Sequence, residues 1–169
     1  TLDAGENRWN TTFVREIAKA LDTIEDDEGQ GALITSSTDS KFFSNGLDLD
    51  WMQAPEDYPD GGDREVFGEE FMYLMGRFIT LPIPTICALN GHTFGAGFMF
   101  ALSHDFRIMR EDRGYLCANE MQLGLPIPRP ELALFKHKIP ANAFFETVQL
   151  SKRWTGTDAL EAGIVQEVS

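Results

Sequence analysis

Apolar residues recur along this chain with two different periods, and the period separates predicted helices from predicted strands. Asn10 can cap a first helix, in which apolar positions three and four residues apart continue as far as the acidic run 25–28. A short apolar run at 32–35 predicts a strand, and a short helix is predicted near 48–53. A longer helix is predicted from about Arg64 to Thr80, because its apolar residues again have the helical period.

The second half of the chain continues this alternation of short apolar runs with helical segments. Residues 98–102 are apolar on every side, which is typical of a buried helix. Pro130 and Pro140 suit the first turns of two further helices, and Thr157 can cap a last one. Strands are predicted at 85–89, 106–109, 115–118 and 165–168. The alternation predicts an α/β fold class.

Two glycine-containing turns each follow a predicted strand and lead into a helix. The first is Ser44-Asn45-Gly46-Leu47, and the second begins at Gly95-Ala96-Gly97 after the strand 85–89 and the break at Asn90-Gly91. If both strands lie parallel in one sheet, both turns open at the edge where ligands bind. Backbone N–H groups there could hold an oxygen that becomes negative during a reaction. The alternative is that both glycines serve only tight packing, since short glycine patterns are weak signals.

Glu120 is a lone carboxylate in an apolar setting, just after the predicted strand 115–118. Burial would raise the pKa of such a group and make it suitable as a general base. The alternative is an ordinary surface glutamate in a loop. The three histidines, His92, His104 and His137, share no metal-binding spacing.

Composition narrows the class of protein. A length of 169 residues fits one domain, and 43% hydrophobic residues allow a packed core. The net charge of −13 argues against a broad nucleic-acid or anionic-membrane surface, although a local pocket could still bind an anion. Cys87 and Cys117 lie in apolar runs and suggest reduced thiols in an intracellular compartment. The segment 54–63, rich in proline, glycine and acids, is predicted to be an exposed loop.

The motifs together resemble the crotonase, or enoyl-CoA hydratase/isomerase, family. They are Phe43-Ser44-Asn45-Gly46-Leu47-Asp48-Leu49, Ala88-Leu89-Asn90-Gly91-His92 with Gly95-Ala96-Gly97, and Asn119-Glu120 with Leu123-Gly124-Leu125. The similarity runs from Asn7 to Val165. It implies a spiral of β-β-α units, with residues 1–169 as one crotonase-like core domain that lacks a first strand and a C-terminal helical region. It also implies assembly into homotrimers or hexamers, an acyl-CoA thioester as ligand, no membrane insertion, and no cofactor apart from the CoA of the substrate.

The resemblance also implies roles for individual residues. It places an oxyanion hole at the backbone N–H groups of Leu47 and Ala96 and a catalytic base at Glu120. The substrate and CoA arm would be bound by Ser44, Asn45, Gly46, Leu47, Asp48 and Gly95.

Within the family, the hydratases carry a second glutamate on the buried helix. This chain has Met99 at that position, and a methionine cannot transfer a proton. The single glutamate resembles the peroxisomal, monofunctional isomerases that convert 3-enoyl-CoA to 2-trans-enoyl-CoA in fatty-acid β-oxidation. A peroxisomal location is therefore expected, with the mitochondrion as a second possibility. The alternatives are another crotonase reaction, such as hydration or thioester hydrolysis, and a catalytically weak acyl-CoA-binding interaction protein.

Overall fold

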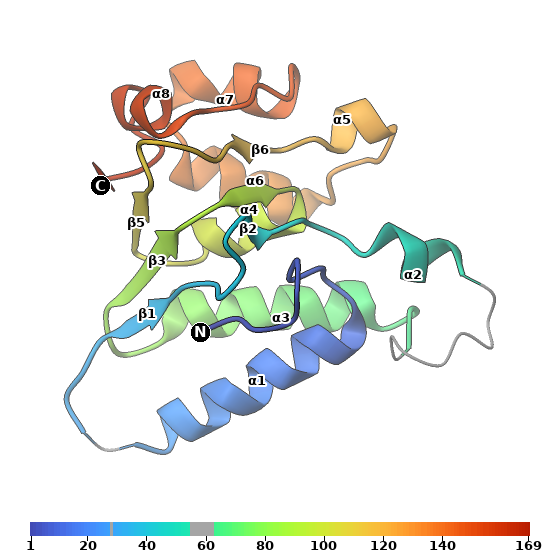
Figure 1. The fold of residues 1–169 in the computed structure, drawn as a ribbon. Helices are drawn as coiled ribbons and strands as arrows, with labels where there is room; N and C mark the ends of the chain where they lie inside the picture. Colours follow the sequence, from blue (N-terminus) through green and yellow to red (C-terminus); the bar gives the residue numbers. More distant parts are fainter. Residues whose placement is uncertain (28, 55–62) are drawn as a thin grey trace.

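A computed structural model describes residues 1–27, 29–54 and 63–169 of the chain (Figure 1). Its helices are α1 Thr11–Glu25, α2 Leu49–Gln53, α3 Phe67–Thr80, α4 Ala96–Leu102, α5 Glu120–Leu123, α6 Arg129–Lys138, α7 Ala141–Val148 and α8 Gly156–Glu161. Its strands are β1 Leu33–Thr35, β2 Phe42–Ser44, β3 Thr85–Leu89, β4 His92–Phe94, β5 Phe106–Met109, β6 Leu116–Cys117 and β7 Glu167–Val168. Across these three described ranges, no helix is long and apolar enough to cross a membrane.

The strands form two parallel sheets, which confirms the predicted α/β class. One sheet has the order β1-β3-β5-β7, and the other has the order β2-β4-β6. In the smaller sheet β4 is the central strand, with Phe42 of β2 opposite His92 and Cys117 of β6 opposite Phe94. Because all three strands run the same way, their carboxyl ends meet at one edge of this sheet.

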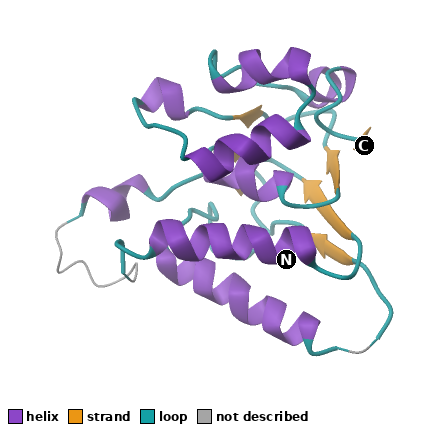
Figure 2. Ribbon diagram, turned by 180° about the vertical axis from the view of Figure 1, so that it is seen from behind, coloured by secondary structure: helices purple, strands orange, loops and turns teal. Residues whose placement is uncertain are grey.

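Helices cover the strands on two sides. In both views α1 and α3 lie side by side on one side of the strands, and α6, α7 and α8 lie on the other (Figures 1 and 2). The α1 helix begins where the Asn10 side-chain oxygen accepts a hydrogen bond from the Phe13 N–H at 2.9 Å. Fully buried Trp9 has its ring within 5.0 Å of Phe13, Phe71 and Phe100, so it joins α1, α3 and α4 in one core.

The structure corrects the sequence predictions at several boundaries. Neither glycine turn directly follows its predicted strand, at 32–35 or 85–89, because residues 42–44 and 92–94 form the extra strands β2 and β4. The last helix begins at Gly156 and is capped by Thr155 rather than Thr157, since the Thr155 hydroxyl accepts from the Asp158 N–H. The final strand, β7, lies within the predicted strand 165–168 and covers its last two residues.

The long helix α3 begins at Phe67, three residues after the predicted start at Arg64. Most of the predicted loop 54–63 lies outside the described residues. His92 lies in β4, half-buried against the rings of Phe94 and Tyr115.

Candidate active site

Three turns leave the carboxyl ends of the strands in the small sheet. Residues 45–47 follow β2, Gly95 and Ala96 follow β4, and Asn119 and Glu120 follow β6. The Gly95 N–H donates to the Cys117 carbonyl at 3.0 Å, which ties the second turn to the third. The sheet therefore brings together segments that are far apart in the sequence.

The two glycines of these turns allow the chain segments to approach closely. Gly46 and Gly95 have φ angles of 79° and 47°, in the left-handed region that favours glycine. A Cβ atom on Gly46 would lie 2.9 Å from the Phe94 carbonyl oxygen and 3.8 Å from the Gly95 Cα. A Cβ atom on Gly95 would lie 3.0 Å from Oε1 of Glu120. The first turn thus touches the second, and the Glu120 carboxylate lies against the second.

Backbone amides at these turns are free to bind an oxygen. In the described part of the chain, the N–H groups of Leu47 and Ala96 have no hydrogen-bond acceptor. The first is held in place by its neighbours, because Trp9 N–H donates to the Gly46 carbonyl at 2.8 Å and Asp48 N–H donates to the Trp9 carbonyl at 2.9 Å. The second begins helix α4, whose first amides have no partner within the helix. Two unpaired donors on adjoining turns suit an oxygen that gains negative charge.

A cavity of about 460 Å³ opens in front of these turns. Five of the predicted substrate-binding or oxyanion-hole residues line it, as does the predicted base: Asn45, Gly46, Leu47, Gly95, Ala96 and Glu120. Its apolar wall consists of Leu49, Met52, Phe67, Phe71, Met99, Leu123, Leu125, Pro126 and Pro128. Arg8 and Arg64 add positive charge to the lining. An apolar cavity with a few converging polar groups is the usual form of a small-molecule site.

The Glu120 carboxyl group is set up to exchange a proton. The residue begins helix α5 and is only 8% exposed. Its Oε2 atom is buried without a hydrogen-bond partner in the described part of the chain. Burial raises the pKa of this carboxyl group, and a hydrogen bond with its own backbone opposes the rise. Glu120 is therefore buried rather than a surface glutamate in a loop.

Two predicted CoA-binding residues do not line the cavity. Ser44 is fully buried, and its hydroxyl donates to the Asn7 carbonyl at 2.7 Å and accepts from the Trp9 indole N–H at 3.0 Å. The Asp48 carboxylate caps helix α2 by accepting from the Trp51 N–H at 3.2 Å. These contacts hold the first turn in place.

Sequence reasoning missed Glu131, a second carboxyl group in the cavity. Glu131 lies in the first turn of α6 and is 8% exposed. Burial, followed by the negative charge of Glu120, raises its pKa to about 7. A signal was present in the sequence, because buried Leu134 and Phe135 follow three and four residues later and share the same helix face.

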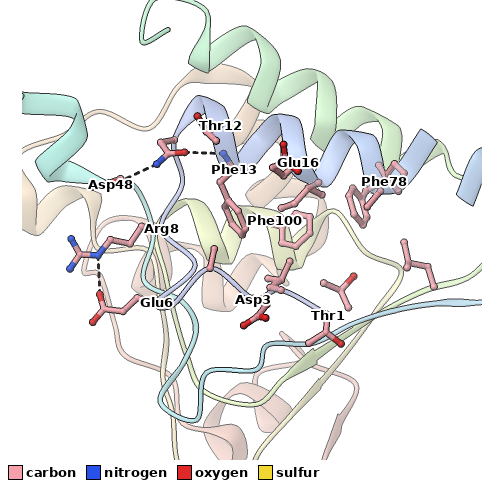
Figure 3. A pocket seen from close by; sticks show the side chains of 18 of the residues that line it. Thr1, Asp3, Glu6, Arg8, Thr12, Phe13, Glu16, Asp48, Phe78 and Phe100 are labelled. Atoms are coloured by element: carbon pink, nitrogen blue, oxygen red, sulfur yellow. Dashed lines mark hydrogen bonds and ion pairs between the residues drawn. The ribbon is translucent and has the colours of Figure 1, made fainter. Parts of the chain in front are cut away.

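A larger cavity of about 900 Å³ lies beneath α1 (Figure 3). Carboxylates line it on several segments, namely Asp3, Glu6, Glu16, Asp48 and Asp50. Its one lining arginine, Arg8, pairs with Glu6 at 2.8 Å and with Asp50 at 3.0 Å. Such a lining repels anionic ligands, and neither Leu47 nor Ala96, whose N–H groups are unpaired, lines this cavity, so the smaller cavity is the candidate site. Among the described residues, no cluster of three or more His, Cys, Asp or Glu side chains is placed to hold a metal ion.

Comparison with known proteins gives a consistent result. The family model described as "Enoyl-CoA hydratase/isomerase" matches residues 3–169. The chain is 35% identical over 167 residues to "Enoyl-CoA delta isomerase 2, peroxisomal" of Arabidopsis thaliana, covering 98% of this chain and 70% of that protein. It is 36% identical over 164 residues to "Enoyl-CoA delta isomerase 1, peroxisomal" of the same plant, covering 95% and 66%. The crystal structure of the enoyl-CoA hydratase EchA3 from Mycobacterium ulcerans is similar in fold, with a TM-score of 0.85 and 26% identity over 96% of this chain and 68% of that one.

Proposed function

The chain belongs to the enoyl-CoA hydratase/isomerase family, and on that premise we propose that it moves the double bond of a 3-enoyl-CoA to give 2-trans-enoyl-CoA. The match over nearly the whole chain supports an acyl-CoA enzyme of this family, whichever reaction it catalyses. The choice of isomerisation is supported by the names of the two plant relatives, by Glu120 in the turn after β6, and by Met99 on α4 where the hydratases carry a second glutamate.

In the proposed reaction, the ionised Glu120 carboxylate removes a proton from the α carbon of the substrate. The C–H electrons form a double bond between the carbonyl carbon and the α carbon, and the carbonyl π electrons move onto the thioester oxygen, giving a dienolate that still has its β–γ double bond. The N–H groups of Leu47 and Ala96 donate to that oxygen. When the carbonyl re-forms, the electrons shift to make the α–β double bond, and the β–γ π electrons take the proton from protonated Glu120 at the γ carbon, which restores the ionised base.

One observation carries this proposal. The unpaired carboxylate of Glu120 lies against Gly95, next to the free N–H of Ala96 and within the same cavity as the free N–H of Leu47. A base and two oxyanion donors facing one apolar cavity are what a one-base proton shift requires. Met99 lies in the same lining, at the helix position where a second acid would serve hydration.

The setting follows as part of the same proposal. Residues 1–169 would form one core domain of the enzyme, and the positive charge of Arg64 would favour the phosphates of CoA near the cavity. The relatives named as peroxisomal support a peroxisomal site of action in fatty-acid metabolism.

The test is to mix the protein with a 3-enoyl-CoA and to follow the conjugated 2-enoyl thioester in the ultraviolet. Hydration of crotonyl-CoA is assayed beside it. Conjugated product without hydration is the expected result. Hydration without isomerisation would contradict the proposal and favour a hydratase, and acyl-CoA binding without either reaction would favour a binding protein.

A further inference from the structure

Two carboxyl groups from different elements face the same cavity. Glu120 comes from α5 and Glu131 from α6, and each is 8% exposed. The apolar side chains of Leu123, Leu125 and Phe71 line the cavity with them. The proposed reaction needs one base, so it leaves Glu131 without a role.

In the described part of the chain, no cationic side chain pairs with Glu131 to hold it ionised. Within the described ranges, Glu131 has no ion pair and no side-chain hydrogen bond. Helix α4, which packs against α6, has no titratable side chain, and Glu146 of α7 pairs with Lys152 at 2.5 Å. Of the two arginines in the lining, Arg8 pairs with Glu6 and Asp50.

The second arginine, Arg64, donates to the Ala54 carbonyl at 2.6 Å. The other charges on α6 itself are Arg129, Lys136, His137 and Lys138. Glu120 is the charged neighbour that acts on Glu131, and it disfavours a second negative charge.

We propose that Glu131 is a specificity-determining carboxyl group of this site, which admits an acyl chain only while it carries its proton. The inference rests on the proposed acyl-CoA function for the identity of the ligand. A neutral Glu131 leaves Glu120 as the one ionised carboxylate, so the base stays available. An acyl chain that fills the cavity displaces water from its wall, and this desolvation is costly when Glu131 is ionised.

The pH range follows from the same two causes. Burial and the charge of Glu120 keep Glu131 protonated up to about pH 7. Acyl binding should therefore be independent of pH well below 7 and weaken above it, by about tenfold per pH unit once Glu131 is ionised. The effect should fall on KM rather than on kcat, because Glu131 acts on binding of the chain.

The experiment measures the affinity of octanoyl-CoA and of free CoA by calorimetry from pH 5.5 to 9. The ratio of the two affinities isolates the acyl cavity, since the CoA phosphates, which also titrate near pH 6, are common to both ligands. Glu131→Gln keeps the size of the side chain and removes its charge. Glu161→Gln is the matched control, because Glu161 is exposed on α8. Thermal melting shows whether each variant is folded.

We expect the ratio to fall above pH 7 in the unmodified protein and in Glu161→Gln, and to stay level in Glu131→Gln. A level ratio in the unmodified protein, or a fall that persists in Glu131→Gln, would overturn the inference. A fall that depends on Glu131 in a protein without isomerase activity would support this inference while contradicting the proposed reaction. Isomerisation together with a level affinity ratio would support the proposed reaction and overturn the inference about Glu131.

Discussion

At the carboxyl end of helix α4 the ring of His104 uses both of its nitrogens, whereas at the amino end the Glu120 carboxylate faces a cavity with one oxygen unpaired. His104 Nδ1–H donates to the Phe100 carbonyl at 2.9 Å, and Nε2 accepts from the Thr35 hydroxyl at 2.9 Å. Both residues are buried. The difference is therefore one of partners rather than of exposure.

The comparison of His104 with Glu120 separates buried polar groups that stabilise the fold from those available for catalysis or binding. Satisfied polar groups in a core fix the packing, while a buried group without a partner is costly and calls for an explanation. Three other buried side-chain atoms also lack partners in the described ranges, on Trp51, His92 and Ser151, but none of them is a carboxylate. Glu120 differs from them because free amides and a cavity lie beside it.

The largest effect is expected at the amino end of α4, where Oε2 of Glu120 has no hydrogen-bond partner among the described residues. Glu120→Gln should lower kcat for isomerisation by about a hundredfold to ten-thousandfold, because an amide cannot accept the α proton. Binding of octanoyl-CoA should remain, since the size of the side chain is unchanged. Steady-state kinetics and calorimetry check this, with Glu161→Gln as control. Unchanged turnover would remove Glu120 from the mechanism.

The second prediction concerns opposing pH effects on stability at the two ends. Glu131 has a folded-state pKa of about 7 against an ordinary 4.5, so the folded protein holds more protons and stability falls as pH rises between these values. His104 has a folded-state pKa of about 4 against an ordinary 6.5, so its contribution rises over nearly the same range. Each amounts to about 3 kcal/mol at about 1.4 kcal/mol per pH unit.

The two slopes oppose each other, so the contributions of Glu131 and His104 to the free energy of unfolding should largely cancel between pH 5 and 6.5 in the unmodified protein. Glu131→Gln removes the opposing contribution of Glu131. The free energy of unfolding of this variant should therefore rise with pH relative to that of the unmodified protein, because the contribution of His104 remains. Urea unfolding at several pH values measures this. Identical pH profiles for the two proteins would show that Glu131 is not held protonated in the fold.

The third prediction targets the alignment of the amides rather than their number. Gly46→Ala would place a methyl group 2.9 Å from the Phe94 carbonyl oxygen and would strain a backbone with φ of 79°. Displacement of the Leu47 N–H by about 1 Å should cost about a hundredfold in kcat. Gly76→Ala is the matched control, because no atom lies within 4 Å of its added methyl group. Equal activity of the two variants would argue against a precise role for the first turn.

The smallest effect is expected at the carboxyl end of α4, where both ring nitrogens of His104 have hydrogen-bond partners. Thr35→Val removes the hydroxyl that serves His104 Nε2 and should lower the free energy of unfolding by about 2 kcal/mol, because a buried ring nitrogen loses its partner. The kcat of the folded variant should stay within about twofold, since Thr35 lies in β1, outside the candidate site. A large loss of kcat without loss of stability would mean that the two ends are coupled.

The sequence predicted most of the helices and the meeting of the two glycine turns, because these depend on local period and on glycine chemistry. It did not reveal β2 or β4, since each is only three residues long in a stretch that looks like part of a turn, and their pairing with each other and with β6 is a long-range effect. Glu131 was missed for a related reason. Its spacing from Leu134 and Phe135 indicated a shared helix face, but a glutamate after Pro130 also suits an exposed first turn, and it is the packing of α6 that places that face in the cavity.

The three turns also divide the proposed chemistry between backbone and side chain in a way that affects mutational tolerance. The donors at positions 47 and 96 belong to the main chain, so every substitution except proline preserves the N–H group itself. The carboxylate at position 120 depends on a single codon. Random mutation should therefore find substitutions at 47 and 96 that keep the activity while they reshape the acyl cavity. Most substitutions at 120 should abolish the reaction. Such a site can alter its substrate range gradually, yet it gains or loses its activity in one step.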